Sequence, residues 1–278
     1  MSEPQPQRAT PLAARATGQP TTTVTVGPVV FGAERVIVVG GPCAVESREQ
    51  MLATAEQVVR AGGAMLRGGA WKPRTSPYDF QGLGRGGLEL LAAARAATGL
   101  PLVTEVLDPR DVADVADVVD MLQIGSRSVQ NFPLLREAGA SGRPVLLKRG
   151  MMTTVEEWLN AAEHVLAAGG AGLVFCERGI RTFEPSLRNT LDLGSVVVLK
   201  EATHFPVIVD PSHAAGDGRY VAALARAAVA AGADGLLVET HCEPAAALSD
   251  ARQTLDAAAF ADLVAGCRAI ARACGRDL

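Results

Sequence analysis

The sequence predicts an α/β fold of the (β/α)8 class, a TIM barrel, on the basis of pattern and length. Eight short apolar runs alternate with longer stretches rich in Ala and Leu, and they are spaced by roughly 20 to 37 residues, which suits one βα unit each. The length of 278 residues suits one barrel of eight such units. A doubly wound open sheet is the alternative, but no recognisable cofactor-binding turn opens any unit.

The apolar runs are the predicted barrel strands. They are short, mostly branched and apolar without alternation, as expected of strands that are buried on both faces. In chain order they are Val36–Val39, Ala64–Leu66, Leu102–Val103, Met121–Ile124, Val145–Leu147, Leu173–Phe175, Val207–Val209 and Leu236–Val238.

Helices are predicted between the strands from signals at their ends. Thr153 with Glu156, and Thr154 with Glu157, are candidate capping boxes. Glycines stand where helices should end before the next strand, at Gly62, Gly99, Gly169 and Gly232.

The segment before the barrel divides into a tail and a hairpin. Residues 1–23 are rich in Thr, Pro, Gln and Ala and lack the apolar run of a signal peptide, so we expect a disordered tail. Val24–Val26 and Val29–Phe31 flank a Gly-Pro pair and predict a short β-hairpin that caps one end of the barrel. We therefore expect residues 24–278 to form a single catalytic domain.

Composition limits the classes of partner. The formal net charge is −4, and no apolar stretch approaches the roughly 20 residues that span a bilayer, so we predict neither a nucleic-acid nor a membrane partner. An odd number of cysteines without a C-x-x-C pair or a secretion signal indicates reduced thiols and a cytoplasmic protein. The cysteines are Cys43, Cys176, Cys242, Cys267 and Cys274.

Charged side chains follow the predicted strands, at the end of the barrel where such enzymes hold their working residues. Cations follow strands two, four, five and six in a chain that is acidic overall, which predicts a substrate, or two, with several negative charges. The whole set is Cys43, Glu46, Arg67, Lys72, Arg74, Glu105, Arg127, Lys148, Arg149, Glu177, Arg178, Arg181, Asp210, His213, Glu239 and His241.

A second group within this set suits a metal ion. Cys43, His213 and Glu239 follow strands one, seven and eight, which become neighbours when a barrel closes. Asp250 lies in the loop after strand eight and can reach the same place. Because a thiolate, an imidazole and carboxylates form a mixed ligand set, we predict one divalent metal ion, Mn, Fe, Co or Zn.

Motifs along nearly all of the chain after residue 35 occur in the order of a known enzyme family. They resemble those of the type Iβ 3-deoxy-D-arabino-heptulosonate 7-phosphate (DAHP) synthases, which open the shikimate pathway to chorismate and the aromatic amino acids. The motifs are GPCAVES (41–47), RGGAWKPRTSPYDFQGLG (67–84), QIGSRSVQN (123–131), LLKRGM (146–151), ERGIRTFE (177–184), RNTLDL (188–193), PVIVDPSHAAG (206–216) and ALSD (247–250).

The resemblance implies a metal-dependent transferase that condenses phosphoenolpyruvate with erythrose 4-phosphate and releases phosphate. It implies phosphoenolpyruvate-binding residues at Arg67, Lys72, Arg127, Lys148 and Arg178. It implies that Arg74 and Thr75 hold the aldose phosphate, and that the metal ligands are Cys43, His213, Glu239 and Asp250. As catalytic groups we predict a proton donor, Lys72 or Lys148, and a group that orients water, Glu105.

Other functions compete with this interpretation. The nearest is a 3-deoxy-8-phosphooctulonate synthase, but its second loop usually carries Lys-Ala-Asn-Arg-Ser-Ser, whereas this chain has Lys72-Pro73-Arg74-Thr75-Ser76. A Schiff-base aldolase that uses Lys148, a catalytically silent barrel, and a specialised secondary-pathway synthase with a modified aldose are the others.

Assembly and regulation are further expectations. We expect a homo-oligomer, a dimer or a tetramer. The residues before Val36 are too few for a regulatory domain, so feedback inhibition would require a partner such as a separate chorismate mutase.

Overall fold

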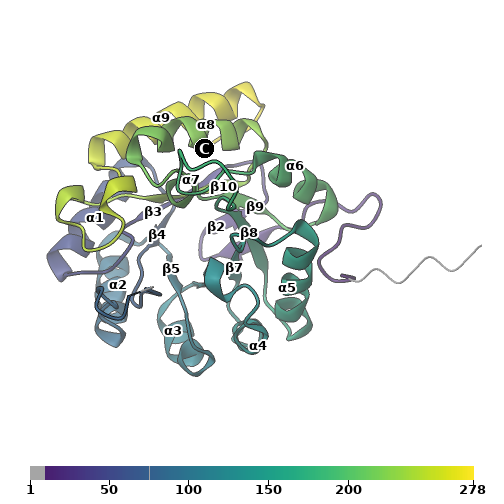
Figure 1. Ribbon diagram of the computed structural model, residues 1–278, viewed down its shortest axis with the longest axis horizontal. Coiled ribbons are helices and arrows are strands. Elements are labelled where there is room, and N and C mark those ends of the chain that lie inside the picture. Colours follow the sequence, from purple (N-terminus) through teal and green to yellow (C-terminus); the bar gives the residue numbers. More distant parts are fainter. Residues whose placement is uncertain (1–9, 75) are drawn as a thin grey trace, which may run out of the picture.

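The computed structural model describes residues 10–74 and 76–278, and its centre is a closed barrel of eight parallel strands (Figure 1). Each strand contains or overlaps one of the predicted apolar runs, and this confirms the (β/α)8 fold. The barrel strands are β3 (Ile37–Gly41), β4 (Met65–Arg67), β5 (Leu102–Glu105), β6 (Met121–Ile124), β7 (Val145–Lys148), β8 (Leu173–Glu177), β9 (Val207–Val209) and β10 (Gly235–Glu239).

The barrel closes where its last strand pairs with its first. β10 pairs with β3 in a parallel register that runs from Gly235 opposite Ile37 to Glu239 opposite Gly41. β9 pairs with β10 on the other side. The seam therefore brings the ends of the first, seventh and eighth barrel strands together, as the sequence predicted.

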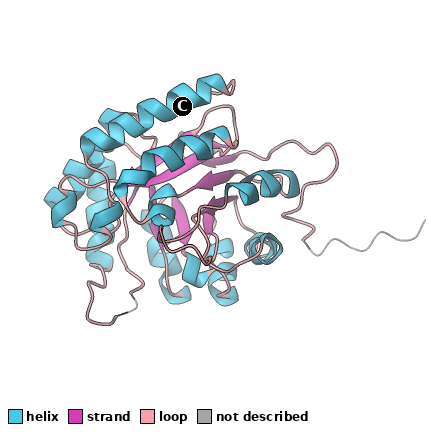
Figure 2. Cartoon of the chain, turned by 45° about the horizontal axis from the view of Figure 1, so that its top comes forward, coloured by secondary structure: helices cyan, strands magenta, loops and turns pink. Residues whose placement is uncertain are grey.

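Helices surround the strands (Figure 2), and successive residues along the strands are buried, as in β3, β6 and β10. Among the described helices, none is long and apolar enough to cross a membrane. The α-helices are α1 (Arg48–Ala61), α2 (Arg85–Thr98), α3 (Val112–Val118), α4 (Phe132–Ala140), α5 (Val155–Ala167), α6 (Leu193–Ala202), α7 (Pro211–Ala215), α8 (Gly218–Ala230) and α9 (Ala257–Ala273). Short 3-10 helices are η1 (Pro109–Asp111), η2 (Ser126–Ser128), η3 (Pro244–Ala246) and η4 (Ala251–Gln253).

The helix-end signals select one of the two candidate capping boxes. α5 begins at Val155, so Thr154 is its N-cap residue, and the reciprocal bonds between Thr154 and Glu157 are both present. Gly62 and Gly99 end α1 and α2 in the left-handed conformation that glycine adopts without strain.

The predicted hairpin is present as β1 (Val24–Val26) and β2 (Val29–Phe31), paired antiparallel. It packs near the residues that precede barrel strands: Gly27 lies against Pro101, and Gly32 lies against Pro206. The hairpin therefore covers the amino ends of the strands and leaves the opposite, carboxyl end open.

The N-terminal segment is ordered from an earlier point than its composition indicates. Residues 1–9 of the expected tail lie outside the described residues. Residues 10–23 lie against the barrel, where the amides of Leu12 and Ala13 donate to the Glu163 carboxylate at 2.8 and 2.6 Å and Ala13 is fully buried. This segment contacts the barrel mainly through backbone hydrogen bonds, and the polarity of its side chains does not predict such bonds.

Candidate active site

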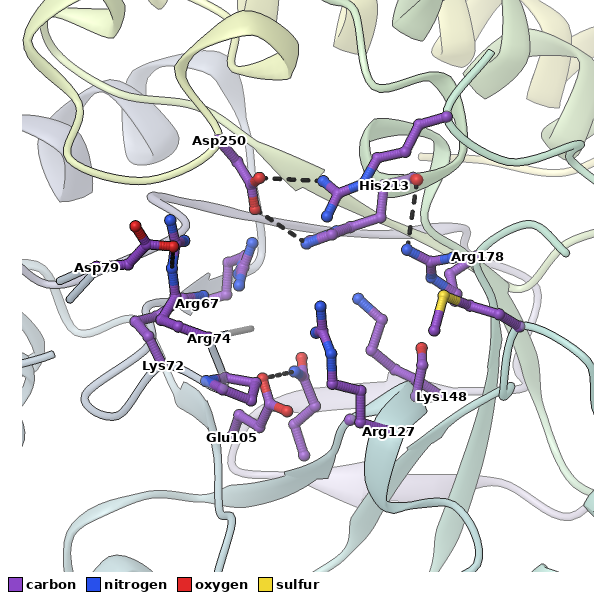
Figure 3. Close-up of a pocket in the computed structure, with 16 residues that line it drawn as sticks. Arg67, Lys72, Arg74, Asp79, Glu105, Arg127, Lys148, Arg178, His213 and Asp250 are labelled. Atoms are coloured by element: carbon purple, nitrogen blue, oxygen red, sulfur yellow. Dashed lines mark hydrogen bonds and ion pairs between the residues drawn. The ribbon is translucent and has the colours of Figure 1, made fainter. Parts of the chain in front are cut away.

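A cavity of about 220 Å³ opens at the carboxyl ends of the strands, and charged side chains line it (Figure 3). Seven of them are cationic, and they lie at the ends of four strands, β4, β6, β7 and β8, or in the segments that follow them: Arg67, Lys72, Arg74, Arg127, Lys148, Arg178 and Arg188. Glu105, Asp79, Asp250 and His213 share the lining. This arrangement confirms that the strand-end cations gather in one concave mouth.

Four possible metal ligands meet at one side of this mouth. Cys43 follows β3, His213 belongs to α7 after β9, Glu239 ends β10, and Asp250 follows in the next loop. One ligand atom from each lies within 4.8 Å of the other three. The strand seam thus produces the cluster, because β9, β10 and β3 are neighbours in the barrel.

A glycine makes room for this cluster. Gly41 has a φ of 146°, and a Cβ there would lie 2.0 Å from the carbonyl oxygen of Arg67. Only glycine fits this close approach of the two strands, and it lets the chain turn to present Cys43.

The tautomer of His213 indicates what the cluster can hold. Its Nδ1 lies 2.6 Å from Asp210 Oδ2, and a carboxylate can only accept, so Nδ1 carries the proton. Burial lowers the pKa of His213, although Asp210 opposes this. The Nε2 lone pair of the neutral ring then faces Glu239 Oε1 at 3.4 Å and Asp250 Oδ2 at 3.8 Å. A lone pair facing two carboxylates is favourable only with a cation between them, so the donor set fits a divalent metal ion.

The thiol of Cys43 also fits this description. Its Sγ lies 3.1 Å from Asp250 Oδ2 and 3.0 Å from Lys72 Nζ. Burial, followed by the negative charge of Glu239, raises the pKa of Cys43 to about 12 despite Lys72. The thiol is therefore neutral at physiological pH without a metal ion, and a metal ion would favour its thiolate.

Asp210 links the cluster to the cationic side of the mouth. Its Oδ2 accepts from both His213 Nδ1 and Lys148 Nζ, and its side chain is fully buried. Burial alone would raise the pKa of Asp210, but His213 and Lys148 hold it well below the ordinary value. Asp210 therefore stays ionised and fixes both neighbours.

Arg178, unlike Lys148, is a cation of the mouth without a carboxylate partner among the described residues. Its guanidinium is buried, yet its hydrogen bonds go to backbone carbonyls, those of Gly179 at 3.2 Å and His213 at 3.4 Å. Burial lowers the pKa of Arg178, against the effect of Asp210. Among the described residues Arg178 forms no ion pair, and a buried cation without an anionic partner is an anion site.

Glu105 is the acidic exception on this side. Its carboxylate fills the space beside Gly125, where an added Cβ would lie 1.8 Å from Oε1. Gln123 Nε2 donates to Oε2 at 3.4 Å. Gly125 and Gln123 together keep the carboxylate inside a cavity in which most of the charged side chains are cationic.

The loop after β4 carries Arg74 to the rim. Arg74 Nη1 donates to Ser249 Oγ at 2.7 Å, and Nε lies 3.4 Å from Asp79 Oδ2. This loop therefore contacts the loop that carries Asp250. Thr75, the other residue predicted for the aldose phosphate, lies outside the described residues.

Comparison with known proteins agrees with this geometry. The model of the DAHP synthetase I family matches residues 18–269. The chain belongs to the DAHP synthetase I family. The resemblance to DAHP synthases inferred from the motifs is thus confirmed.

Individual relatives locate the chain more closely within the family. It is 47% identical to a phospho-2-dehydro-3-deoxyheptonate aldolase of Thermotoga maritima over 254 residues, 91% of this chain and 75% of that protein. It is 34% identical to a 2-dehydro-3-deoxyphosphooctonate aldolase of Syntrophotalea carbinolica over 252 residues, 84% of this chain and 90% of that protein. The DAHP synthase side of the family is therefore the closer of the two.

Solved structures agree with this placement. The crystal structure of the Thermotoga maritima DAHP synthase superposes with a TM-score of 0.92 at 46% identity, over 96% of this chain and 78% of that one. A truncated form of the DAHP synthase from the same organism gives a TM-score of 0.91 at 43% identity, over 97% of this chain and 99% of that one.

Not every residue singled out at a strand end from the sequence reaches the cavity. Arg149 and Glu177 pair with each other at 2.9 Å and are buried away from it. Glu46 and His241 lie 3.5 Å apart outside the cavity lining, and Arg181 lines a neighbouring cavity instead.

Two residues at the site had no role assigned from the sequence. Arg188 lines the cavity and donates to Asp250 Oδ1 at 3.0 Å. Gln253 is buried and donates to Glu239 Oε2 at 2.6 Å. Arg188 opens the RNTLDL motif, so the motif was visible in the sequence, but its distance along the chain from the end of β8 hid its position in space.

Proposed function

We propose that this chain is a metal-dependent DAHP synthase that condenses phosphoenolpyruvate with erythrose 4-phosphate to give DAHP and inorganic phosphate. One observation carries the proposal: the cluster of metal ligands and the cationic cavity form a single mouth. His213 and Asp250 belong to both, since they line the cavity and also supply ligand atoms. Family membership and the 47% identity to the Thermotoga maritima enzyme support it.

The cations divide into two anion-binding groups. Arg67, Lys72, Arg127, Lys148 and Arg178 hold the carboxylate and phosphate of phosphoenolpyruvate. Arg74, at the rim of the mouth, and Thr75 hold the phosphate of the aldose. Two groups of cations at one small cavity suit two short phosphorylated substrates, because guanidinium and ammonium groups bind such anions with charge-assisted hydrogen bonds.

The metal ligands are Cys43, His213, Glu239 and Asp250, and the ion is one of Mn, Fe, Co or Zn. When bound, such an ion supplies a Lewis acid that polarises a carbonyl oxygen. The aldehyde of the aldose therefore lies at the cluster side of the mouth, and phosphoenolpyruvate lies among the buried cations.

The reaction joins two carbon atoms and breaks one C–O bond. C3 of phosphoenolpyruvate bonds to the aldehyde carbon, and the aldehyde oxygen takes a proton from Lys72 or Lys148. Lys72 contacts the ligand cluster directly, with its Nζ 3.0 Å from Cys43 Sγ. Water then adds to C2 and gives one proton to Glu105. The C2–O bond to the phosphate breaks next, and the phosphate leaves with its bridging oxygen and takes the remaining proton of the C2 hydroxyl as C2 becomes the ketone.

A Schiff-base mechanism at Lys148 is less consistent with the site. Such a mechanism requires a neutral amine, whereas Lys148 is buried in an ion pair with Asp210. The same lysine suits anion binding, since its ammonium group stays fixed at the cavity wall.

Phosphate release tests the proposal. The protein is assayed with phosphoenolpyruvate and either erythrose 4-phosphate or arabinose 5-phosphate, before and after a chelator, and after divalent metal ions are restored. We expect release only with both substrates, faster with erythrose 4-phosphate, lost with the chelator and regained with metal. Faster turnover of arabinose 5-phosphate would assign the octulosonate reaction instead, and full activity in metal-free protein would refute the metal requirement.

We also propose a cytoplasmic homo-oligomer, dimeric or tetrameric, that a separate chorismate mutase regulates. Light scattering on the purified chain tests the oligomeric state. Kinetics with aromatic amino acids, with and without the mutase, test the regulation, and unchanged kinetics would remove it.

A further inference from the structure

The two carboxylates of the ligand cluster each have one oxygen that faces the cluster and one that does not. Glu239 Oε1 lies 3.4 Å from His213 Nε2, and Asp250 Oδ2 lies 3.8 Å from the same nitrogen. The remaining oxygens, Glu239 Oε2 and Asp250 Oδ1, point away and have partners of their own. What holds them decides how each carboxylate presents itself to a metal ion.

Both outward oxygens are tied to one hydrogen-bonded pair. Gln253 Nε2 donates to Glu239 Oε2 at 2.6 Å, and Arg188 Nη1 donates to Asp250 Oδ1 at 3.0 Å. The same Arg188 Nη1 donates to Gln253 Oε1 at 3.0 Å. A continuous path thus runs from one carboxylate through Gln253 and Arg188 to the other.

This path requires at position 253 a side chain that both accepts and donates a hydrogen bond. Arg188 can only donate and Glu239 can only accept, so the group between them must accept on one side and donate on the other. A glutamine side chain does both without adding a charge of its own beside Glu239. The Gln253 side chain is 2% exposed, so water does not substitute for either bond.

Gln253 also holds the backbone that carries Asp250. Asp250 has a φ of 54°, the only positive φ of a non-glycine residue within 10–74 and 76–278. The backbone N–H of Gln253 donates to the backbone carbonyl of Asp250 at 3.1 Å and closes this turn. One residue therefore fixes both the turn at Asp250 and the carboxylate of Glu239.

We infer that Gln253 is a positioning residue which, with Arg188, orients Glu239 and Asp250 so that each offers a single oxygen to the metal ion. The inference rests on the proposed metal site. Groups that hydrogen-bond to metal ligands typically contribute about 10- to 100-fold to metal affinity. The path from Gln253 reaches two ligands at once.

Cobalt titration of three full-length variants tests the inference. Gln253→Leu removes both side-chain bonds. Gln253→Glu keeps the size of the side chain but replaces the donor with an oxygen beside Glu239. Gln57→Leu is the matched control, because Gln57 is also a buried amide, bonded to Thr240 and not to a ligand.

The readout is the dissociation constant for Co²⁺, followed by its visible absorption, with the unfolding midpoint of each variant measured in chelator. We expect Gln253→Leu and Gln253→Glu to weaken Co²⁺ binding about 10- to 100-fold and Gln57→Leu to leave it unchanged. Wild-type affinity in either Gln253 variant would overturn the inference. So would an equal loss in all three, which would indicate general loosening of the barrel.

The outcome is separable from the fate of the proposed function. Wild-type protein that binds Co²⁺ but releases no phosphate from the two substrates would refute the synthase activity and leave the role of Gln253 standing. Wild-type protein that binds no Co²⁺ would overturn both.

Discussion

The two sides of the mouth differ in how their charges are balanced. On the ligand side each carboxylate has a partner: Glu239 pairs with Arg67 at 2.5 Å, and Asp250 pairs with Arg188 at 3.0 Å. On the opposite side Arg178 is as buried as Arg67, but its hydrogen bonds go only to backbone carbonyls. The carboxylates of the first side are balanced by cations of the protein, whereas Arg178 on the second side gains an anionic partner only when an anion binds. Substitutions on the two sides should therefore fail in different ways.

Removing one arginine from each side should separate stability from binding. Arg67→Met leaves the buried Glu239 carboxylate without its cation and should cost about 3 to 5 kcal/mol of unfolding free energy in metal-free protein. Arg178→Met removes a cation that has no carboxylate partner, so its cost should stay below about 1 kcal/mol. Urea unfolding in chelator measures both.

Arg178→Met should weaken substrate binding although it changes stability little. Loss of its charge-assisted hydrogen bonds should raise the KM for phosphoenolpyruvate about 10- to 100-fold while the protein stays folded. If Arg178→Met instead unfolded as readily as Arg67→Met, the contrast between the two sides would be wrong.

On the ligand side, Cys43→Ser should weaken metal binding and activity together. A serine hydroxyl loses its proton far less readily than a thiol and is a poorer ligand for a transition metal, so we expect a loss of affinity on the order of 100-fold. The measurements are metal content after dialysis and turnover at saturating metal. Cys267→Ser, at a buried position on α9 remote from the cluster, is the matched control.

Wild-type metal content in Cys43→Ser would contradict the ligand role of the thiol. A parallel loss in Cys267→Ser would indicate that a buried serine disturbs the fold rather than the site.

The barrel and most of its mouth could be predicted from the sequence because the barrel topology determines where residues at the strand ends lie. Once eight alternating units close, residues at strand ends such as Cys43, Lys148 and Glu239 must face one opening. Arg188 and Gln253 lie in connections whose path is set by packing rather than by strand order. Their positions therefore required the folded structure.

The N-terminal segment was missed for a related reason. Leu12 and Ala13 bind Glu163 through backbone amides, which every residue type except proline carries. A polar composition therefore does not separate this docked segment from a disordered one.

The smallest effect that we predict is the release of one proton from Cys43 when a metal ion binds. In metal-free protein the pKa of Cys43 is raised to about 12 from an ordinary value of 9.0. The folded state binds this proton more tightly than the unfolded state, so the contribution to stability is complete below about pH 9 and is lost as the pH rises toward 12. At pH 8 the thiol is therefore protonated until a metal ion binds.

Metal binding at pH 8 should release that proton and no other. Burial lowers the pKa of His213, so its ring is already neutral. Against the opposing effect of burial, His213 and nearby arginines lower the pKa of Glu239 and Asp250, so both carboxylates are already ionised. Calorimetric titration with Co²⁺ in buffers of different ionisation enthalpy should give about one proton released per metal ion, and close to none in Cys43→Ser. Wild-type protein that releases none would mean that the metal ion does not bind the sulfur, and the ligand side of the mouth would then consist of His213 and the two carboxylates alone.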